Sequence, residues 1–272
     1  MKYIYIPFFL LISLHFIFAH GRLDKRIKEV SEEIKSNPDS AFLYLKRGNL
    51  YYQHDEFKKS IRDFKKCSKL EYKNSRLFFG FAKSYEGLEK FTTSLDYVNK
   101  ILTDNAQDVK ALRLKGQLLF KKKEYVEAAN SFERVVEYAD KTIPENYLEI
   151  SRAWEESNDK EVLYRTSNSI KQGIEDLGEL HVFYTRLIEL YLEFGDYNSA
   201  LVYQTKMLEN SLRKEKAYYS RALIYLKKGN RIAAKSDLEK SLSAIDQTPE
   251  RTKNNKAMKD LKAIVLQSLE KL

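Results

Sequence analysis

Few side chains in this sequence have the types and the spacing that catalysis or metal binding requires. The chain has four histidines and one cysteine, and beyond the N-terminal segment only His54 and His181 remain, 127 residues apart. A zinc site needs three or four Cys, His or carboxylate ligands, usually at short spacings. Cys67 has no second cysteine for an internal disulfide, and we expect it to be buried and unreactive. We therefore predict no metal site and no cofactor.

Motifs for phosphate binding and for nucleophilic catalysis are also missing. The sequence contains no glycine-rich phosphate loop, no Gly-x-Ser-x-Gly turn and no paired Cys and His. Its many carboxylates are spread as on any solvated helix, and no pair is marked by contrasting surroundings, which acid-base catalysis needs. We predict a protein that is not an enzyme and has no small-molecule substrate.

The first 21 residues have the pattern of an export signal. Lys2 precedes a mostly apolar run from Tyr3 to Ala19, and the run closes with Ala19-His20-Gly21. A positive start, an apolar middle and small residues at the end predict a signal peptide cleaved before Arg22, with an uncleaved anchor as the alternative. No cysteine follows for lipid attachment, so we expect an exported protein, periplasmic or secreted.

Composition favours an all-helical chain with a basic surface. Only four prolines and nine glycines interrupt 272 residues, and 43% of the residues are hydrophobic. The formal net charge is +9, but Lys and Glu are intermixed, as on solvated helix faces.

A unit of about 34 residues repeats along most of the chain. Within each unit a large residue at the fourth place is followed, seven places later, by another on the same helical stripe. The place between them holds a small residue in five units, at Gly48, Ala82, Gly116, Ser151 and Ala222, and Ile188 in the other. A turn follows, and then a second helical segment with small residues where two helices would cross closely, at Ser60, Ser94, Ala128, Ala200 and Ala234. Repeats of this length predict a solenoid of helical hairpins.

These residues resemble the tetratricopeptide repeat family, whose unit has a bulky residue at place four, a small one at eight, Tyr at eleven, Ala at twenty and an aromatic at twenty-four. The places that match in register are Gly48, Tyr51, Phe64, Gly116, Ala128, Phe132, Ala222, Tyr225 and Ala234. The resemblance covers residues 41 to about 248. It implies an all-α, right-handed superhelix, with about fourteen helices in this chain.

Six hairpins are expected, with a cap at each end. Their predicted bounds are 41–74, 75–108, 109–143, 144–180, 181–214 and 215–248. Residues 22–40 predict an orphan second helix as the N-terminal cap, and 249–272 a closing helix, because the ends of a solenoid have no neighbour to cover them. The fourth unit departs from the pattern at Ser151 and Leu163, and the fifth at Ile188.

The resemblance also implies where a partner would bind. In this family the concave wall is made by places two, five, nine and twelve of each first helix. The wall residues expected here to bind a peptide are Asn49, Tyr52, Arg76, Phe79, Lys83, Lys110, Arg113, Gln117 and Phe120. Cations with rings between them suit an extended, acidic peptide, although solvated polar side chains would give the same pattern.

We therefore expect an exported scaffold or adaptor that binds a protein or an extended peptide. One alternative is electrostatic binding to an anionic membrane or cell-envelope polymer, through lysines such as those at 121–123 and 227–228. Single-stranded nucleic acid, bound by basic and aromatic residues, is the more distant alternative. Membrane contact would need the uncleaved N-terminal segment or this basic surface.

Overall fold

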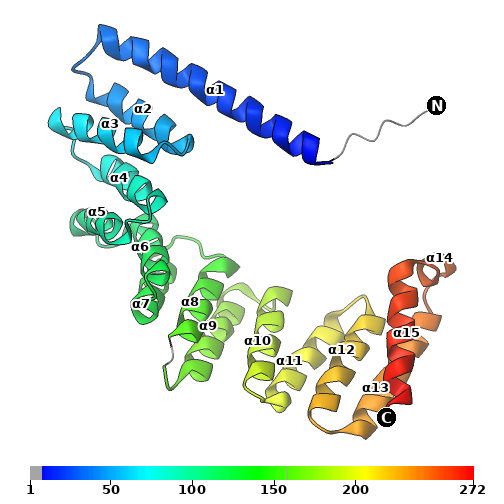
Figure 1. Cartoon of the computed structure of the whole chain (residues 1–272). Helices are drawn as coiled ribbons and strands as arrows, with labels where there is room; N and C mark the ends of the chain where they lie inside the picture. Colours follow the sequence, from blue (N-terminus) through cyan, green and yellow to red (C-terminus); the bar gives the residue numbers. More distant parts are fainter. Residues whose placement is uncertain (1–7, 158) are drawn as a thin grey trace, which may run out of the picture. The chain divides into compact units, whose positions relative to one another are not determined.

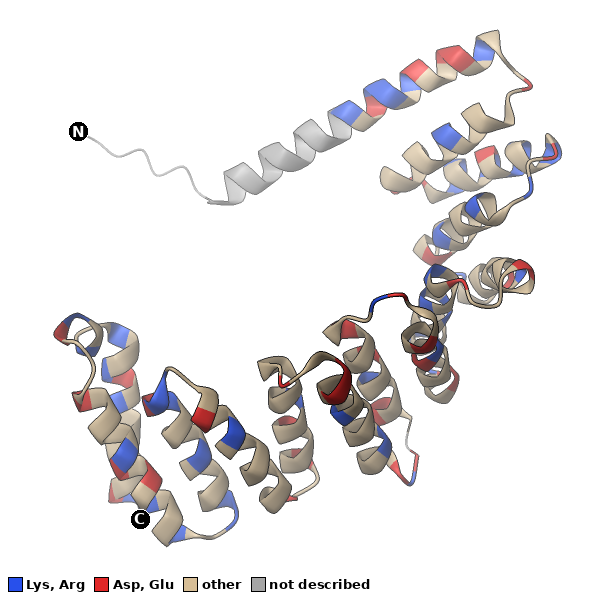
Figure 2. Ribbon diagram, turned by 180° about the vertical axis from the view of Figure 1, so that it is seen from behind, with Lys and Arg blue, Asp and Glu red and all other residues tan. Residues whose placement is uncertain are grey.

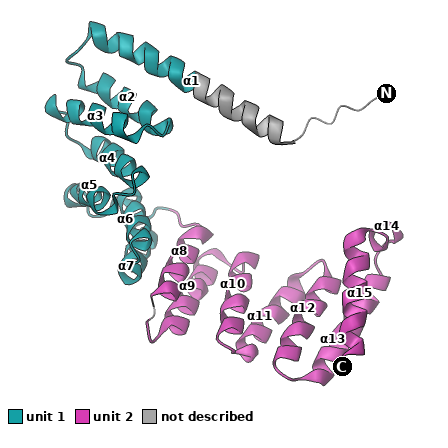
Figure 3. Ribbon diagram, in the orientation of Figure 1, with its two compact units in different colours: residues 1–140 teal, residues 141–272 magenta. Residues whose placement is uncertain are grey.

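The computed structural model describes residues 8–157 and 159–272, with side chains from Arg22 onward, and this part of the chain is helical with no strand. It forms two compact units, residues 1–140 and 141–272, each a row of antiparallel helix pairs (Figures 1 and 3). The expected all-α fold of stacked helical hairpins is confirmed.

The first unit contains one long helix and three hairpins. Its helices are α1 (Phe8–Ser36), α2 (Ala41–Gln53), α3 (Phe57–Lys69), α4 (Ser75–Gly87), α5 (Phe91–Asp104), α6 (Val109–Lys121) and α7 (Tyr125–Tyr138). Each helix packs on the next along the chain, and α2 also contacts α4.

The second unit contains three more hairpins and a closing pair. Its helices are α8 (Pro144–Glu156), α9 (Val162–Leu177), α10 (His181–Glu193), α11 (Tyr197–Asn210), α12 (Lys214–Lys227), α13 (Arg231–Asp246), α14 (Glu250–Lys253) and α15 (Lys256–Glu270). The described residues thus form fifteen helices against about fourteen expected. The difference arises at the closing helix, expected as one element from Thr252. The structure has two helices there, because extended backbone at Asn255 interrupts the first and starts the second. The Asn255 side chain caps the new helix by accepting a hydrogen bond from the Met258 amide (2.8 Å).

Local signals in the sequence set the helix ends. Asn74 and Asp108 cap α4 and α6 by accepting hydrogen bonds from the amides of Leu77 (3.1 Å) and Ala111 (2.9 Å). In the second unit Asp196 and Asn230 cap α11 and α13 in the same way. These caps fix where each of the four helices begins, and so which of its residues face its neighbours.

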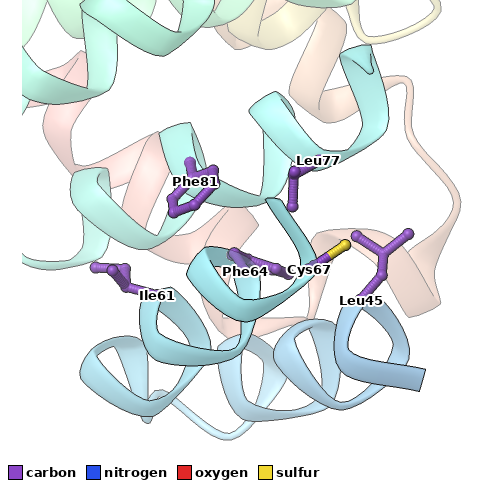
Figure 4. Close-up of a cluster of buried hydrophobic side chains, with 6 residues drawn as sticks. All are labelled: Leu45, Ile61, Phe64, Cys67, Leu77 and Phe81. Carbon is purple, nitrogen blue, oxygen red and sulfur yellow. The ribbon is translucent and has the colours of Figure 1, made fainter. Parts of the chain in front are cut away.

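The hydrophobic core follows the repeat. Phe64, Cys67 and Leu77 are fully buried together in the first unit (Figure 4). Gly48 is needed where α2 crosses α3, because a Cβ there would lie 2.5 Å from Cε1 of Phe64. The expected burial of Cys67 is confirmed, and burial raises the pKa of its thiol to about 11.

Helix α1 includes the predicted N-terminal cap. Its residues Val30 and Ile34 are buried against Leu43 and Leu50 of α2, with Ile27 packed beside them. The helix begins at Phe8, so it spans the predicted cleavage site before Arg22. Residues 1–7 of the predicted signal lie outside the described residues, and its removal stays a prediction. None of the helices in the described chain is long and apolar enough to cross a membrane.

Candidate binding surface on the first helices

All nine residues predicted to bind a peptide lie on the first helices of the three hairpins in the first unit. Asn49 and Tyr52 are on α2; Arg76, Phe79 and Lys83 are on α4; Lys110, Arg113, Gln117 and Phe120 are on α6. Arg76 and Lys110 are exposed and the other seven are half-buried. We call this surface of α2, α4 and α6 the first-helix wall.

The structure brings two of the nine, Asn49 and Arg76, to one hollow of about 210 Å³. Its lining comes from α1, α2 and α4, and it comprises Arg26, Phe42, Leu45, Lys46, Asn49, Leu50, Gln53 and Arg76. The floor is apolar, and 58% of Phe42 is exposed at its edge. Lys46 is paired with Glu33 of α1 (3.2 Å), whereas Arg26 and Arg76 form no ion pair among the described residues. This hollow combines cations with apolar surface.

Arg26 is a residue of this hollow that the sequence interpretation missed. It stands 34 residues before Ser60, at the place where the second helices of five of the six hairpins carry Ser or Ala. A small residue is needed there where a first helix crosses closely. Among the described residues α1 packs on α2, the first helix that follows it. Extending the repeat register backwards from Ser60 would have identified Arg26.

The middle of the first-helix wall is held by an ion-pair cluster at Glu86. The Glu86 carboxylate accepts hydrogen bonds from Nζ of Lys83 (3.0 Å) and from Nζ of Lys121 (2.8 Å), so it joins α4 to α6. Burial opposes ionisation of Glu86, but the two lysines outweigh it and hold the pKa of this carboxyl below its usual value. Lys83 therefore shares its charge with Glu86 and is a weaker anchor for an anionic partner than Arg76 or Lys110.

The predicted aromatic residues of the wall also pack within the hairpins. The Tyr52 ring lies 5.9 Å from Phe57, and the Phe120 ring lies edge-on 5.1 Å from Tyr125. Arg113 and Gln117 likewise interact with other residues of the chain. The wall is thus largely preformed, with Arg76, Lys110 and Phe42 its most accessible parts.

The second unit has two hollows that the sequence interpretation missed. The larger, of about 750 Å³, lies between α8 and α10 and is lined by Leu148, Arg152, Glu155, His181, Val182, Thr185, Arg186 and Glu189. Arg186 donates a hydrogen bond to Glu155 across it. The other, of about 490 Å³, also includes His181 and lies among α10, α11 and α12. Six residues of the larger hollow occupy wall places of the fourth and fifth repeats, so the repeat register would have found them too.

Nothing in this surface has the arrangement of a metal centre. Among the residues that the structure describes, no three His, Cys, Asp or Glu side chains lie close enough to hold a metal ion. The thiol of Cys67 is buried and its pKa is raised, so it stays protonated at neutral pH.

Comparisons with known proteins agree with this architecture. Residues 215–248, which form most of α12 and all of α13, match the family model of the tetratricopeptide repeat. No curated protein matches the chain. Among the solved structures that match, two share the fold over most of the length of this chain. The C-terminal part of a repeat-containing protein of Cytophaga hutchinsonii is 13% identical, with a TM-score of 0.65, covering 91% of this chain and 97% of that one.

A tetratricopeptide repeat protein of Parabacteroides merdae is 17% identical, with a TM-score of 0.53, covering 94% of this chain and 97% of that one. At such low identities, structural similarity indicates a shared fold and no more. The family match adds sequence evidence for one whole repeat. The resemblance drawn from the repeat residues is confirmed: the chain contains a tetratricopeptide repeat at residues 215–248 and has the fold of tetratricopeptide repeat proteins over most of its length.

Proposed function

We propose that the chain is a non-enzymatic adaptor that binds an acidic, extended segment of a partner protein along the first-helix wall. The observation that carries the proposal is the hollow among α1, α2 and α4, where Arg26, Lys46 and Arg76 surround an apolar floor. In a repeat fold of this kind each hairpin buries its apolar side only against its neighbours. The stack of hairpins therefore presents an extended surface, and a protein partner binds on that surface.

The chemistry of the hollow fits one type of ligand. Guanidinium groups bind carboxylates through paired, charge-assisted hydrogen bonds, and Arg26 and Arg76 have no such partner within the described chain. Phe42 and Leu45 offer apolar surface beside them. An acidic residue next to an apolar one, in an extended peptide, would satisfy both parts of the site.

Site-specific crosslinking tests this proposal. A photoreactive amino acid at Phe42 should capture a partner in the native host, and a synthetic peptide covering the captured segment should bind the purified chain. The double variant R26E/R76E should bind that peptide at least about tenfold more weakly. Reversing two exposed lysines of the second unit, K227E/K228E, is the matched control. Equal affinity of the peptide for both variants would contradict the proposal.

The structure weakens the alternative of a general electrostatic binder. Of the three lysines at 121–123, Lys121 is paired with Glu86 (2.8 Å) and Lys122 with Glu124 (2.7 Å). Each pair lowers the charge available to a polymer or a membrane. Binding that falls steeply with salt and does not depend on Arg26 and Arg76 would favour this alternative.

We also propose that the protein is exported, on the evidence of its N-terminal sequence. The positive start, the apolar run and Ala19-His20-Gly21 support cleavage before Arg22. N-terminal sequencing of the protein purified from its native host should read from Arg22, in the periplasmic or the secreted fraction. A mature chain in the cytoplasmic fraction that still begins at Met1 would contradict export.

A further inference from the structure

Helix α3 carries an unusual charge for a helix of this chain. Six of its thirteen residues are Lys or Arg, and its single acidic residue, Asp63, is buried and bonded to Arg47. Five of the cations are exposed, and four of these follow one another at intervals of four, three and four residues, at Lys58, Arg62, Lys65 and Lys69. Figure 2 marks the Lys and Arg positions of the chain in blue along the ribbon. Side chains at these intervals lie on one face of a helix. We call this row the α3 stripe; at 1.5 Å per residue it is about 16 Å long.

One end of the α3 stripe borders a hollow of about 380 Å³. The hollow lies among α3, α4 and α5, away from the residues that line the first-helix wall, and it comprises Lys65, Ser68, Lys69, Lys73, Phe78, Phe81, Tyr97 and Lys100. Four ammonium groups therefore surround a floor of three aromatic rings. We call it the α3–α5 hollow.

The floor of the α3–α5 hollow is rigidly built. The rings of Phe81 and Tyr97 stack with centroids 4.5 Å apart and planes 13° apart, and Tyr85 stacks on both. Phe81 is also part of the buried cluster with Phe64 (Figure 4). Nζ of Lys100 lies 4.6 Å from the centre of the Tyr97 ring and 5.7 Å from that of Phe78. These contacts hold the ammonium group of Lys100 over the rings, at the rim of the α3–α5 hollow.

Little of the charge around this hollow is neutralised within the chain. Lys73 is paired with Glu71 (2.9 Å), but among the described residues Lys65, Lys69 and Lys100 form no ion pair. Unpaired ammonium groups beside an apolar floor complement a ligand with both negative charge and an apolar group.

We propose that the α3 stripe and the α3–α5 hollow form a second docking site, for an acidic polypeptide segment with one aromatic or large apolar side chain. The carboxylates lie along Lys58, Arg62, Lys65 and Lys69, and the apolar side chain enters the hollow against Phe78 and Tyr97. This site shares helix α4 with the first-helix wall but none of the nine predicted wall residues, so one chain holds two protein segments at once. The site therefore goes beyond the proposed function.

A polypeptide fits this surface better than a membrane does. A helix that lies on a membrane presents apolar side chains outward, to enter the acyl layer. The exposed stripe consists of cations, and the rings of the hollow are buried or half-buried. A side chain on a flexible peptide reaches such rings, whereas a lipid bilayer does not.

The test is a binding measurement with a defined probe. The probe is a fluorescein-labelled peptide of about eight residues, all glutamate except one central phenylalanine, long enough in extended form to follow the stripe into the hollow. Fluorescence anisotropy should show binding to the full chain. The triple variant K65E/K69E/K100E should bind it at least about tenfold more weakly. Replacing the phenylalanine of the probe by serine should also weaken binding, with no change in the protein.

A matched variant separates this site from general electrostatics. K235E/K256E/K259E makes the same change in net charge at three exposed lysines of the second unit, none of them in an ion pair among the described residues. It should bind the probe within about threefold of the unchanged chain. Circular dichroism of each variant establishes that it is folded.

Three results would overturn the proposal. One is equal loss of binding in the two triple variants, and another is equal affinity for the phenylalanine and serine probes. The third is binding to vesicles that contain anionic lipid, lost in K65E/K69E/K100E, with no binding of the probe. If R26E/R76E alone abolishes probe binding, the first-helix wall is supported and the second site is not, so the two proposals fail separately.

Discussion

Arg47 holds Asp63 in a two-bond contact that recurs five repeats later. Nε and Nη2 of Arg47 donate to the two carboxylate oxygens of Asp63 at 2.6 and 2.9 Å, and Arg221 binds Asp237 at the same two distances. In both places the aspartate follows the arginine by sixteen residues. The contact therefore fixes the two helices of a hairpin in one register, in the first repeat and in the sixth.

The same arginines also identify what α1 is. Nη1 of Arg47 donates to the hydroxyl of Ser31 on α1 at 3.1 Å, and Nη1 of Arg221 donates to Thr205 on α11 at 3.1 Å. Ser31 thus has the place that Thr205 has on the second helix of the fifth repeat. This contact supports the interpretation of the segment before Ala41 as an orphan second helix, which stays a prediction.

Removing the aspartate of either pair should destabilise the chain strongly. Asp63 and Asp237 are buried, and Asp63→Ala or Asp237→Ala leaves a guanidinium in the hairpin with no carboxylate. We expect a loss of about 3 to 5 kcal/mol in the free energy of unfolding, measured with urea. Glu32→Ala, which breaks the exposed pair with Lys35, should cost about 1 kcal/mol or less. Similar losses in the buried and exposed variants would show that the contact does not fix the hairpin.

The repeat register made most of the fold predictable from sequence. Hairpin partners lie at constant separations, so a few small and large residues, such as Gly48 and Tyr51, locate every helix of a repeat. What the register does not give is the pairing of charges between repeats. Glu86 meets Lys121, which lies 35 residues later and on the next first helix, and only the stacking of one hairpin on the next brings them together. Lys83 meets the same Glu86 within α4, three residues later, a spacing that the sequence itself shows.

The hollows show the same limit. Wall residues were chosen by place within a repeat, which found Asn49 and Arg76 but not Arg26, on a helix before the first full unit. The α3–α5 hollow was missed because the resemblance directs attention to first helices. Its signal was present in the composition of residues 57–69, where the lysines gather on one face.

The close approach of Gly48 to Phe64 should make this position intolerant of a side chain. A Cβ at residue 48 would lie 2.5 Å from the ring of Phe64, which is fully buried. Gly48→Ala should therefore lower the free energy of unfolding by about 1 to 3 kcal/mol. In the background of Phe64→Leu, whose side chain is smaller, the same change should cost less. A double-mutant cycle from urea unfolding measures this coupling, and additive effects would show that the ring does not contact residue 48.

The carboxylate of Glu86 should make stability depend on pH in the acidic range. Its pKa is lowered in the folded chain, because the hydrogen bonds from Lys121 and Lys83 outweigh the effect of burial. A lowered pKa stabilises the folded chain. This stabilisation is fully present above the pKa of the carboxyl in the unfolded chain, about 4.5, and is lost as the pH falls through its pKa in the folded chain. At pH 7 Glu86→Gln should cost about 1 kcal/mol, and the difference from the unchanged chain should shrink progressively as the pH falls below about 4.5.

Glu89→Gln is the control for this pH profile. Glu89 is exposed and forms no ion pair among the described residues, so the variant should follow the unchanged chain from pH 7 down to pH 3. A Glu86→Gln difference that stays constant over this range would contradict the role given to the ion-pair cluster.

The turns inside the hairpins offer a reciprocal test of backbone strain. Lys123 has a positive φ of 63° in the turn before α7, where the sixth repeat has Gly229 with a φ of 82°. A residue with a Cβ is strained in this conformation, whereas glycine is not, although glycine also loses more entropy on folding. Lys123→Gly should therefore raise the free energy of unfolding by up to about 1 kcal/mol, and Gly229→Lys should lower it by a similar amount. Urea unfolding of both variants measures the two changes in the free energy of unfolding. Changes of the same sign would show that the turn conformation does not determine them.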